Sequence, residues 1–259
     1  MNVRRELKSQ IRDHEFVSMR IQHLLRTAVL SLIAAAVLHA QAPQTEPDQR
    51  RPAVPTVTFT FDWPAVEPHR YIISVESSGN ATYRSWTTDA GAEQSDASDP
   101  DSLKFVVSMA ARDRIFALAR QLNYFNGDFE YHKHRVAATG DKTLAYADKD
   151  RQSATRYNWS ENGGISELTE LFQGISATIE SGRSLERLYR FERLGLDEEL
   201  KNLQRLAAER QATELQLIAP ILERLANDPG VMNIARQRAR QILQAAAAPA
   251  ADAGPASRR

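Results

Sequence analysis

Thr56-Val57-Thr58-Phe59-Thr60-Phe61-Asp62 alternates apolar and polar side chains without a break. Successive side chains on a strand point to opposite faces, so Val57, Phe59 and Phe61 share one face and the threonines share the other. The stretch therefore predicts a strand with one buried and one solvated face, which is typical of an antiparallel sheet.

The residues that follow repeat this pattern. Residues 70–76 alternate in the same way, 77–80 have the composition of a turn, and 81–88 are predicted to be the returning strand. Residues 103–107 form a short apolar run, either a strand or the approach to a helix. Further strands are predicted at 128–135, 142–147 and 154–159.

Helical spacing appears twice. Ser108 is a suitable N-cap for a helix over 109–122, and from Ile165 apolar residues recur on one stripe as far as 180. More helices are predicted at 184–194, 197–218 and 229–245. We therefore expect an α+β fold, in which an antiparallel sheet of hairpins carries helices on one face and a C-terminal α-helical segment follows.

Two local patterns point to a family. Gly79-Asn80-Ala81-Thr82-Tyr83 combines a glycine turn with a tyrosine on the returning strand, and Leu122-Asn123-Tyr124-Phe125 places paired aromatics at a helix end. In these features residues 70–180 resemble a small α+β domain of unknown function found in exported bacterial proteins. Members often carry a cysteine pair before the first hairpin strand, which this chain lacks. The resemblance implies an α+β fold and export, and it supplies no activity or site residues.

The N-terminus has the composition of a secretory signal. Basic residues after Met19 precede the uncharged apolar run 27–38, and Ala40-Gln41-Ala42 is an A-x-A cleavage sequence. We expect cleavage after Ala42, or after Ala40 because Pro43 hinders the first site. An uncleaved inner-membrane anchor is the alternative, but such a helix needs about 20 apolar residues. The sequence thus predicts a periplasmic or extracellular protein whose true start is Met19, since residues 1–18 do not fit a signal.

Composition sets the expected organisation. We expect a linker at 43–55, an α+β domain at 56–181, a helical segment at 182–245 and a disordered tail at 246–259. The chain has no cysteine, which excludes disulfides, thiolate metal sites and a lipoprotein anchor. Its formal net charge is zero, so no nucleic-acid partner is expected, and the membrane is contacted only if the signal segment stays uncleaved.

One stretch carries candidate metal ligands. If residues 128–135 form a strand, Asp128, Glu130, His132 and His134 share a face, and nitrogen and oxygen ligands of this kind can bind a divalent metal. The alternative is that these side chains are merely solvated while the aromatic residues between them face the core. The candidate metal ligands are His132, His134 and Glu130, completed by a residue from elsewhere.

No catalytic motif occurs elsewhere, because the chain contains neither H-E-x-x-H nor G-x-S-x-G. We therefore expect a non-catalytic binding or interaction module with a protein or other envelope partner. The alternative is a metal-binding protein or metal-dependent enzyme that uses His132 and His134. Apart from that metal, no cofactor is expected.

Overall fold

The computed structural model describes residues 52–87 and 101–247. All the described residues belong to one compact unit of the chain. The predicted signal peptide with its cleavage site, most of the linker and the tail from residue 248 lie outside the described residues. None of the described helices has the length and apolar character that crossing a membrane requires.

In the described part of the chain, six strands form one antiparallel sheet. Their order in space is β4-β3-β2-β1-β5-β6, so β1 lies between β2 and β5. Together with the helices, this sheet confirms the predicted α+β class. In chain order the strands are β1 (Thr56–Asp62), β2 (Arg70–Glu76), β3 (Asn80–Trp86), β4 (Asp101–Val106), β5 (Asp141–Ala147) and β6 (Gln152–Tyr157).

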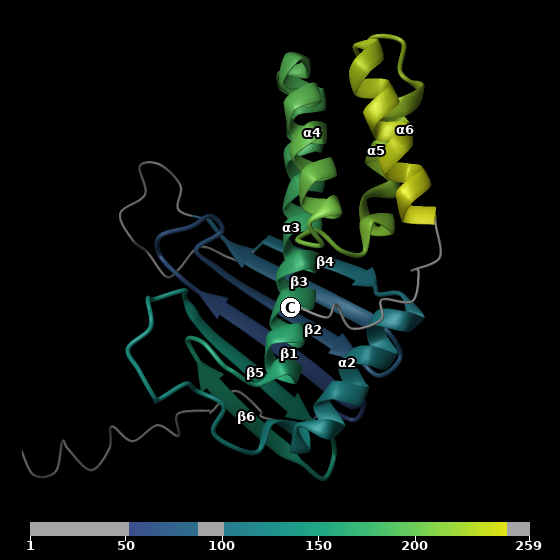
Figure 1. The fold of residues 1–259 in the computed structure, drawn as a ribbon. Coiled ribbons are helices and arrows are strands. Elements are labelled where there is room, and N and C mark those ends of the chain that lie inside the picture. The colour runs from purple at the N-terminus through teal and green to yellow at the C-terminus, as the bar shows by residue number, and fades with distance from the viewer. Residues whose placement is uncertain (1–51, 88–100, 248–259) are drawn as a thin grey trace, which may run out of the picture. The chain divides into compact units, whose positions relative to one another are not determined.

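The alternation of β1 sorts the two faces of the sheet as predicted. Val57, Phe59 and Phe61 are buried, whereas the threonines between them are partly exposed. Figure 1 shows α2 (Met109–Gln121) and α3 (Gly163–Phe191) on the same face of the sheet. The ring of Phe59 stacks on that of Phe172 in α3, with centroids 5.2 Å apart. The helices therefore close the core over the apolar face.

The start of α2 is held by a cap and by a distant carboxylate. The Oγ of Ser108 accepts a hydrogen bond from Ala111 N at 3.1 Å, as the sequence predicts for an N-cap. The Glu214 carboxylate accepts hydrogen bonds from Ser108 N at 2.6 Å and from Ser108 Oγ at 2.8 Å. This second contact fastens the C-terminal helical segment to the helix that covers the sheet.

A turn of left-handed residues follows α2. Asn123, Tyr124 and Phe125 have φ values of 49°, 57° and 68°, and they form the short helix η1 (Asn123–Phe125). The left-handed region costs an L-residue about 1–2 kcal/mol. Phe125 is fully buried in the core, and Ser153 Oγ donates a hydrogen bond to the carbonyl of Tyr124. These contacts hold the turn in a conformation that its sequence alone disfavours.

α3 is one continuous helix of 29 residues, about 43 Å long. Its first half packs on the sheet, while Leu185 belongs to the core of the helical segment, so the helix is shared by both cores. The separate helices predicted at 165–180 and 184–194 are therefore wrong, and the boundary expected after residue 181 falls inside α3. Gly182 lies within α3, and its lack of a side chain leaves room for the close neighbour Ile218.

The remaining helices build a second core around the end of α3 (Figure 1). A short helix joins α3 to α4, and the single helix predicted over 197–218 is wrong, because the chain leaves α4 at Ala208. The helix predicted at 229–245 is present as α6, but it begins at Asn233 rather than beside Pro229. The elements are η2 (Arg193–Gly195), α4 (Leu196–Ala208), η3 (Leu215–Ile218), α5 (Ala219–Asn227) and α6 (Asn233–Ala247).

Candidate functional site

The segment that carries the predicted metal ligands, residues 126–140, is neither helix nor strand. The strand predicted there is therefore wrong. The Oδ1 of Asp128 accepts a hydrogen bond from Glu130 N at 3.0 Å, and such local side-chain bonds compete with strand pairing. A backbone hydrogen bond from Tyr131 N to Trp159 O, 3.0 Å long, ties the segment to the chain beyond β6.

The predicted ligands have separate partners. His132 Nε2 lies 2.9 Å from Asp128 Oδ2, Glu130 accepts a hydrogen bond from the backbone of Asn158, and His134 faces a tyrosine ring at 6.3 Å. Within residues 52–87 and 101–247, no group of three or more histidine, aspartate and glutamate side chains is placed to hold a metal ion. The metal site stays a prediction from the sequence.

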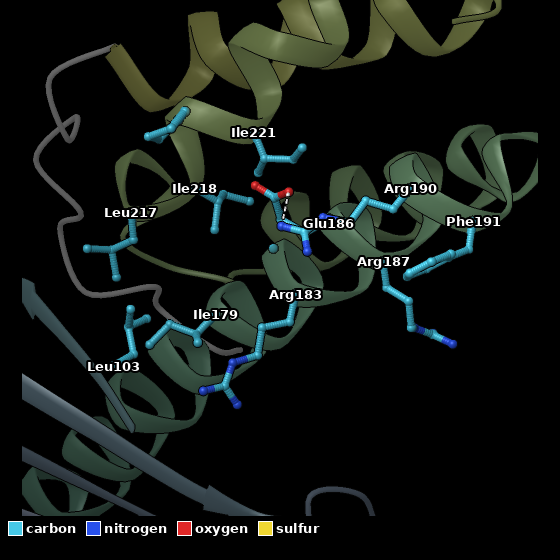
Figure 2. Close-up of a pocket in the computed structure, with 12 residues that line it drawn as sticks. Leu103, Ile179, Arg183, Glu186, Arg187, Arg190, Phe191, Leu217, Ile218 and Ile221 are labelled. Carbon is cyan, nitrogen blue, oxygen red and sulfur yellow. Dashed lines mark ion pairs between the residues drawn. The ribbon is translucent and has the colours of Figure 1, made fainter. Parts of the chain in front are cut away.

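A groove lies between α3 and the η3–α5 segment, and we call it the α3 groove. Its volume is about 440 Å³, and it is open to solvent. Figure 2 shows side chains from both segments, together with Leu103 of β4, arranged around it. The groove is lined by Leu103, Ile179, Gly182, Arg183, Glu186, Arg187, Arg190, Phe191, Leu217, Ile218, Pro220 and Ile221.

The periodicity of α3 explains what the groove contains. Residues three and four apart share a helix face, so Ile179, Arg183, Arg187 and Arg190 follow one another along the wall. The opposite wall is apolar, because η3 and the first turn of α5 contribute only leucine, isoleucine and proline to the lining. Gly182 allows this wall to approach α3 closely. The groove therefore has an apolar wall, formed by η3 and α5, opposite a row of arginine side chains on α3.

Arg183 anchors the inner end of this row. Its Nη1 donates to Ser85 Oγ at 2.7 Å and to Glu180 Oε1 at 3.0 Å. Glu180 in turn accepts a hydrogen bond from the hydroxyl of the buried Tyr83 at 2.7 Å. Burial, and next the nearby charge of Glu180, raise the pKa of Tyr83, so its hydroxyl stays a proton donor. Arg183 is thus part of a fixed polar network under the groove.

The outer arginines are less constrained. Arg190 meets Glu186 only at 3.8 Å and keeps 66% of its side chain exposed. Glu186 is closer to Arg224 of α5, at 2.9 Å. Within the described residues Arg187 makes no hydrogen bond through its side chain, although its charge acts on the half-buried Glu199 of α4. These two guanidinium groups therefore retain donors that can face a ligand.

The groove opens toward an exposed aromatic ring. Phe191 ends α3 with 83% of its surface exposed, and it belongs to the lining. Leu194 in η2 is 80% exposed. Single exposed apolar side chains are common on protein surfaces, but Phe191 belongs to the lining and so extends the apolar surface of the groove.

Sequence reasoning missed these residues. The separate helices expected at 165–180 and 184–194 hid the continuity of α3, so the residues that share its groove face were not connected. Arginines at 183, 187 and 190 on the same face as Ile179 were the available signal. The opposite wall had no signal, since η3 lies about 35 residues further along the chain.

No family model matches the chain, and no curated protein matches it. The resemblance to a domain of exported proteins therefore remains an expectation from the sequence.

Proposed function

We propose that this protein is an exported, non-catalytic binding module that takes a small anionic amphiphile into the α3 groove. The amphiphile would be an apolar chain that ends in a carboxylate, sulfonate or phosphate. The observation that carries the proposal is that the apolar wall of the groove lies opposite the guanidinium groups of Arg187 and Arg190. Export and the non-catalytic character come from the sequence.

The two halves of the groove suit the two halves of such a ligand. The leucine and isoleucine side chains of the lining offer apolar surface to the chain, and its burial is favourable by about 25 cal/mol per Å². Guanidinium groups bind planar or tetrahedral oxyanions through two parallel hydrogen bonds. The lining contains no serine, histidine or lysine, and its one carboxylate, Glu186, is paired with Arg224 at 2.9 Å, which supports binding rather than nucleophilic chemistry.

The expected affinity is modest. Ligands of about 15 non-hydrogen atoms contribute roughly 0.3 kcal/mol per atom or somewhat more, which corresponds to dissociation constants in the micromolar to millimolar range. A hydrogen bond to a charged group contributes about 1.5–3 kcal/mol. Loss of the guanidinium groups should therefore reduce affinity at least tenfold.

The test uses the chain from Pro43 onward, which contains all the described residues. Anilinonaphthalene sulfonate serves as a fluorescent anionic probe, and dodecanoate as its competitor. We expect the probe to fluoresce on binding and dodecanoate to displace it. The double variant Arg187→Gln/Arg190→Gln should lose at least tenfold in affinity for both.

The matched control is Arg205→Gln, which removes an exposed arginine of α4 that pairs with Glu209 outside the groove. It should bind as the unmodified protein does. Equal binding of dodecanoate by the control and the double variant would refute the groove as the site. Dodecanol that binds as tightly as dodecanoate would refute the role of the arginines.

A further inference from the structure

A second cavity lies beside α2, and we call it the α2 pocket. Its volume is about 470 Å³. It shares no residue with the α3 groove. Its lining consists of Pro55, Ser77, Arg112, Asp113, Phe116, Arg120, Tyr124 and Tyr146.

One face of α2 supplies the cationic side of this pocket. Arg112, Phe116 and Arg120 are spaced at i, i+4 and i+8, so an aromatic ring lies between two arginines on the same face. Arg112 is engaged by its neighbour, because its Nε and Nη2 donate to Asp113 Oδ1 at 2.9 and 2.8 Å. Arg120 forms no ion pair and no side-chain hydrogen bond within the described residues. Its guanidinium is therefore the available anion-binding group.

The aromatic side of the pocket comes from the left-handed turn after α2. The ring centroids of Tyr124 and Tyr146 are 4.6 Å apart. The guanidinium carbon of Arg151 lies 3.9 Å from the centroid of the Tyr124 ring. The hydroxyl of Tyr146 donates to Asp148 at 2.9 Å. These contacts fix both rings at the pocket wall.

The strained backbone of this turn places Tyr124 in the wall of the pocket. Bulky L-residues rarely adopt the left-handed conformation, and Tyr124 and Phe125 both do so here. Phe125 faces the core and Tyr124 faces the pocket. Strained residues of this kind persist where the surrounding structure over-determines them, and they often lie at binding sites.

We propose that the α2 pocket binds a small aromatic anion, that is, a planar ring that bears a carboxylate or a phosphate. The anion pairs with Arg120, and Arg112 offsets the negative charge of Asp113, which also lines the pocket. The ring packs against Phe116 and the wall formed by Tyr124 and Tyr146, because aromatic rings favour offset or edge-to-face contacts with one another. This site is independent of the amphiphile proposed for the α3 groove.

Isothermal titration of the chain from Pro43 onward tests the proposal with four probes. Phenyl phosphate and benzoate carry both features, inorganic phosphate lacks the ring, and cyclohexanecarboxylate lacks its planarity. We expect the two aromatic anions to bind at least tenfold more tightly than the other two. Inorganic phosphate that binds as well as phenyl phosphate would overturn the proposal, because the rings would then contribute nothing.

Variants locate the site. Arg120→Gln should weaken benzoate binding at least tenfold, and Arg112→Gln should weaken it less. Arg114→Gln is the control, because Arg114 lies on the same helix but pairs with Glu167 and does not line the pocket. Circular dichroism confirms that each variant is folded. Benzoate binding that survives Arg120→Gln unchanged, or that the unmodified protein lacks, would overturn the proposal.

Discussion

Gly182 lies inside α3 at a point where the chain beyond α4 leaves no room for a side chain. A Cβ built on Gly182 would lie 2.4 Å from Cγ2 of Ile218 and 3.3 Å from its Cβ. Eight residues earlier on the same helix face, a Cβ on Gly174 would lie 2.7 Å from Oγ1 of Thr213. Real Cβ atoms do not approach other heavy atoms this closely, so Gly182→Ala forces the η3 segment to move.

The magnitude follows from two opposing effects. Alanine is more favourable than glycine in a helix interior by about 1 kcal/mol. Overpacking of a core by one carbon costs typically about 1–3 kcal/mol. Ile218 is β-branched, and its short distance at Cβ as well as Cγ2 means that no rotamer change removes the contact. We therefore expect Gly182→Ala to lower the free energy of unfolding by up to about 2 kcal/mol.

Urea denaturation followed by far-ultraviolet circular dichroism measures this change. Gly163→Ala is the matched control, because nothing lies within 4 Å of a Cβ at Gly163, in the first turn of the same helix. The two substitutions should differ by about 1–3 kcal/mol. Ile218→Leu, which moves the methyl group away from Cβ, should recover part of the loss. A Gly182→Ala protein that is stabilised as much as the Gly163→Ala protein would refute a steric conflict with Ile218.

Three further predictions follow from other buried groups. Burial raises the pKa of Tyr71, Tyr83 and Tyr157, so above pH 10 the unfolded chain loses these protons while the folded chain keeps them. The free energy of unfolding should therefore fall above pH 10 by up to about 1.4 kcal/mol per pH unit for each tyrosine. Tyr157→Phe should make this fall less steep in thermal melts. Lys142 acts in the opposite direction, because burial lowers its pKa and the folded chain loses this one proton before the unfolded chain does. Its contribution therefore raises the free energy of unfolding as the pH rises toward 10. Lys142 Nζ donates to the carbonyls of residues 139, 140 and 158 at 2.8–2.9 Å, so Lys142→Met should cost about 1–3 kcal/mol in urea unfolding, and a neutral result would refute this role. Gly140 has a φ of 89° and a Cβ there would lie 2.8 Å from Phe61 and Trp63, so Gly140→Ala should lower stability by about 1–3 kcal/mol, whereas an unchanged melting temperature would contradict the steric argument.

The sheet was predictable because its signal is local. In β1 and β2 every second residue is apolar and buried, and β2 pairs antiparallel with β3 across the turn predicted at 77–80. Helix α2 was predictable for the same reason, since its cap at Ser108 and its buried stripe lie within one short window. Periodicity reports directly which side of a strand or helix must be buried.

The errors arose where long-range contacts decide the structure. Residues 128–135 have a strand-like composition, yet Asp128 forms a local turn and the segment gains only a single backbone bond to the chain beyond β6. A break was also expected between the helices predicted at 165–180 and 184–194, where Gly182 lies. In the structure Gly182 is the place where a distant segment packs closely, which no local pattern reveals.

The sequence by itself determined the α+β class, the strand hairpins, the two helices that cover the sheet and the prediction of export. These features depend on periodicity, capping and composition, which act over a few neighbouring residues. Only the tertiary structure decided that α3 runs unbroken between two cores, and that its arginines meet the apolar residues of η3 and α5 in a groove. The physical reason is that a groove forms between segments about 35 residues apart, whose contact depends on packing across Gly182 rather than on either segment's own pattern.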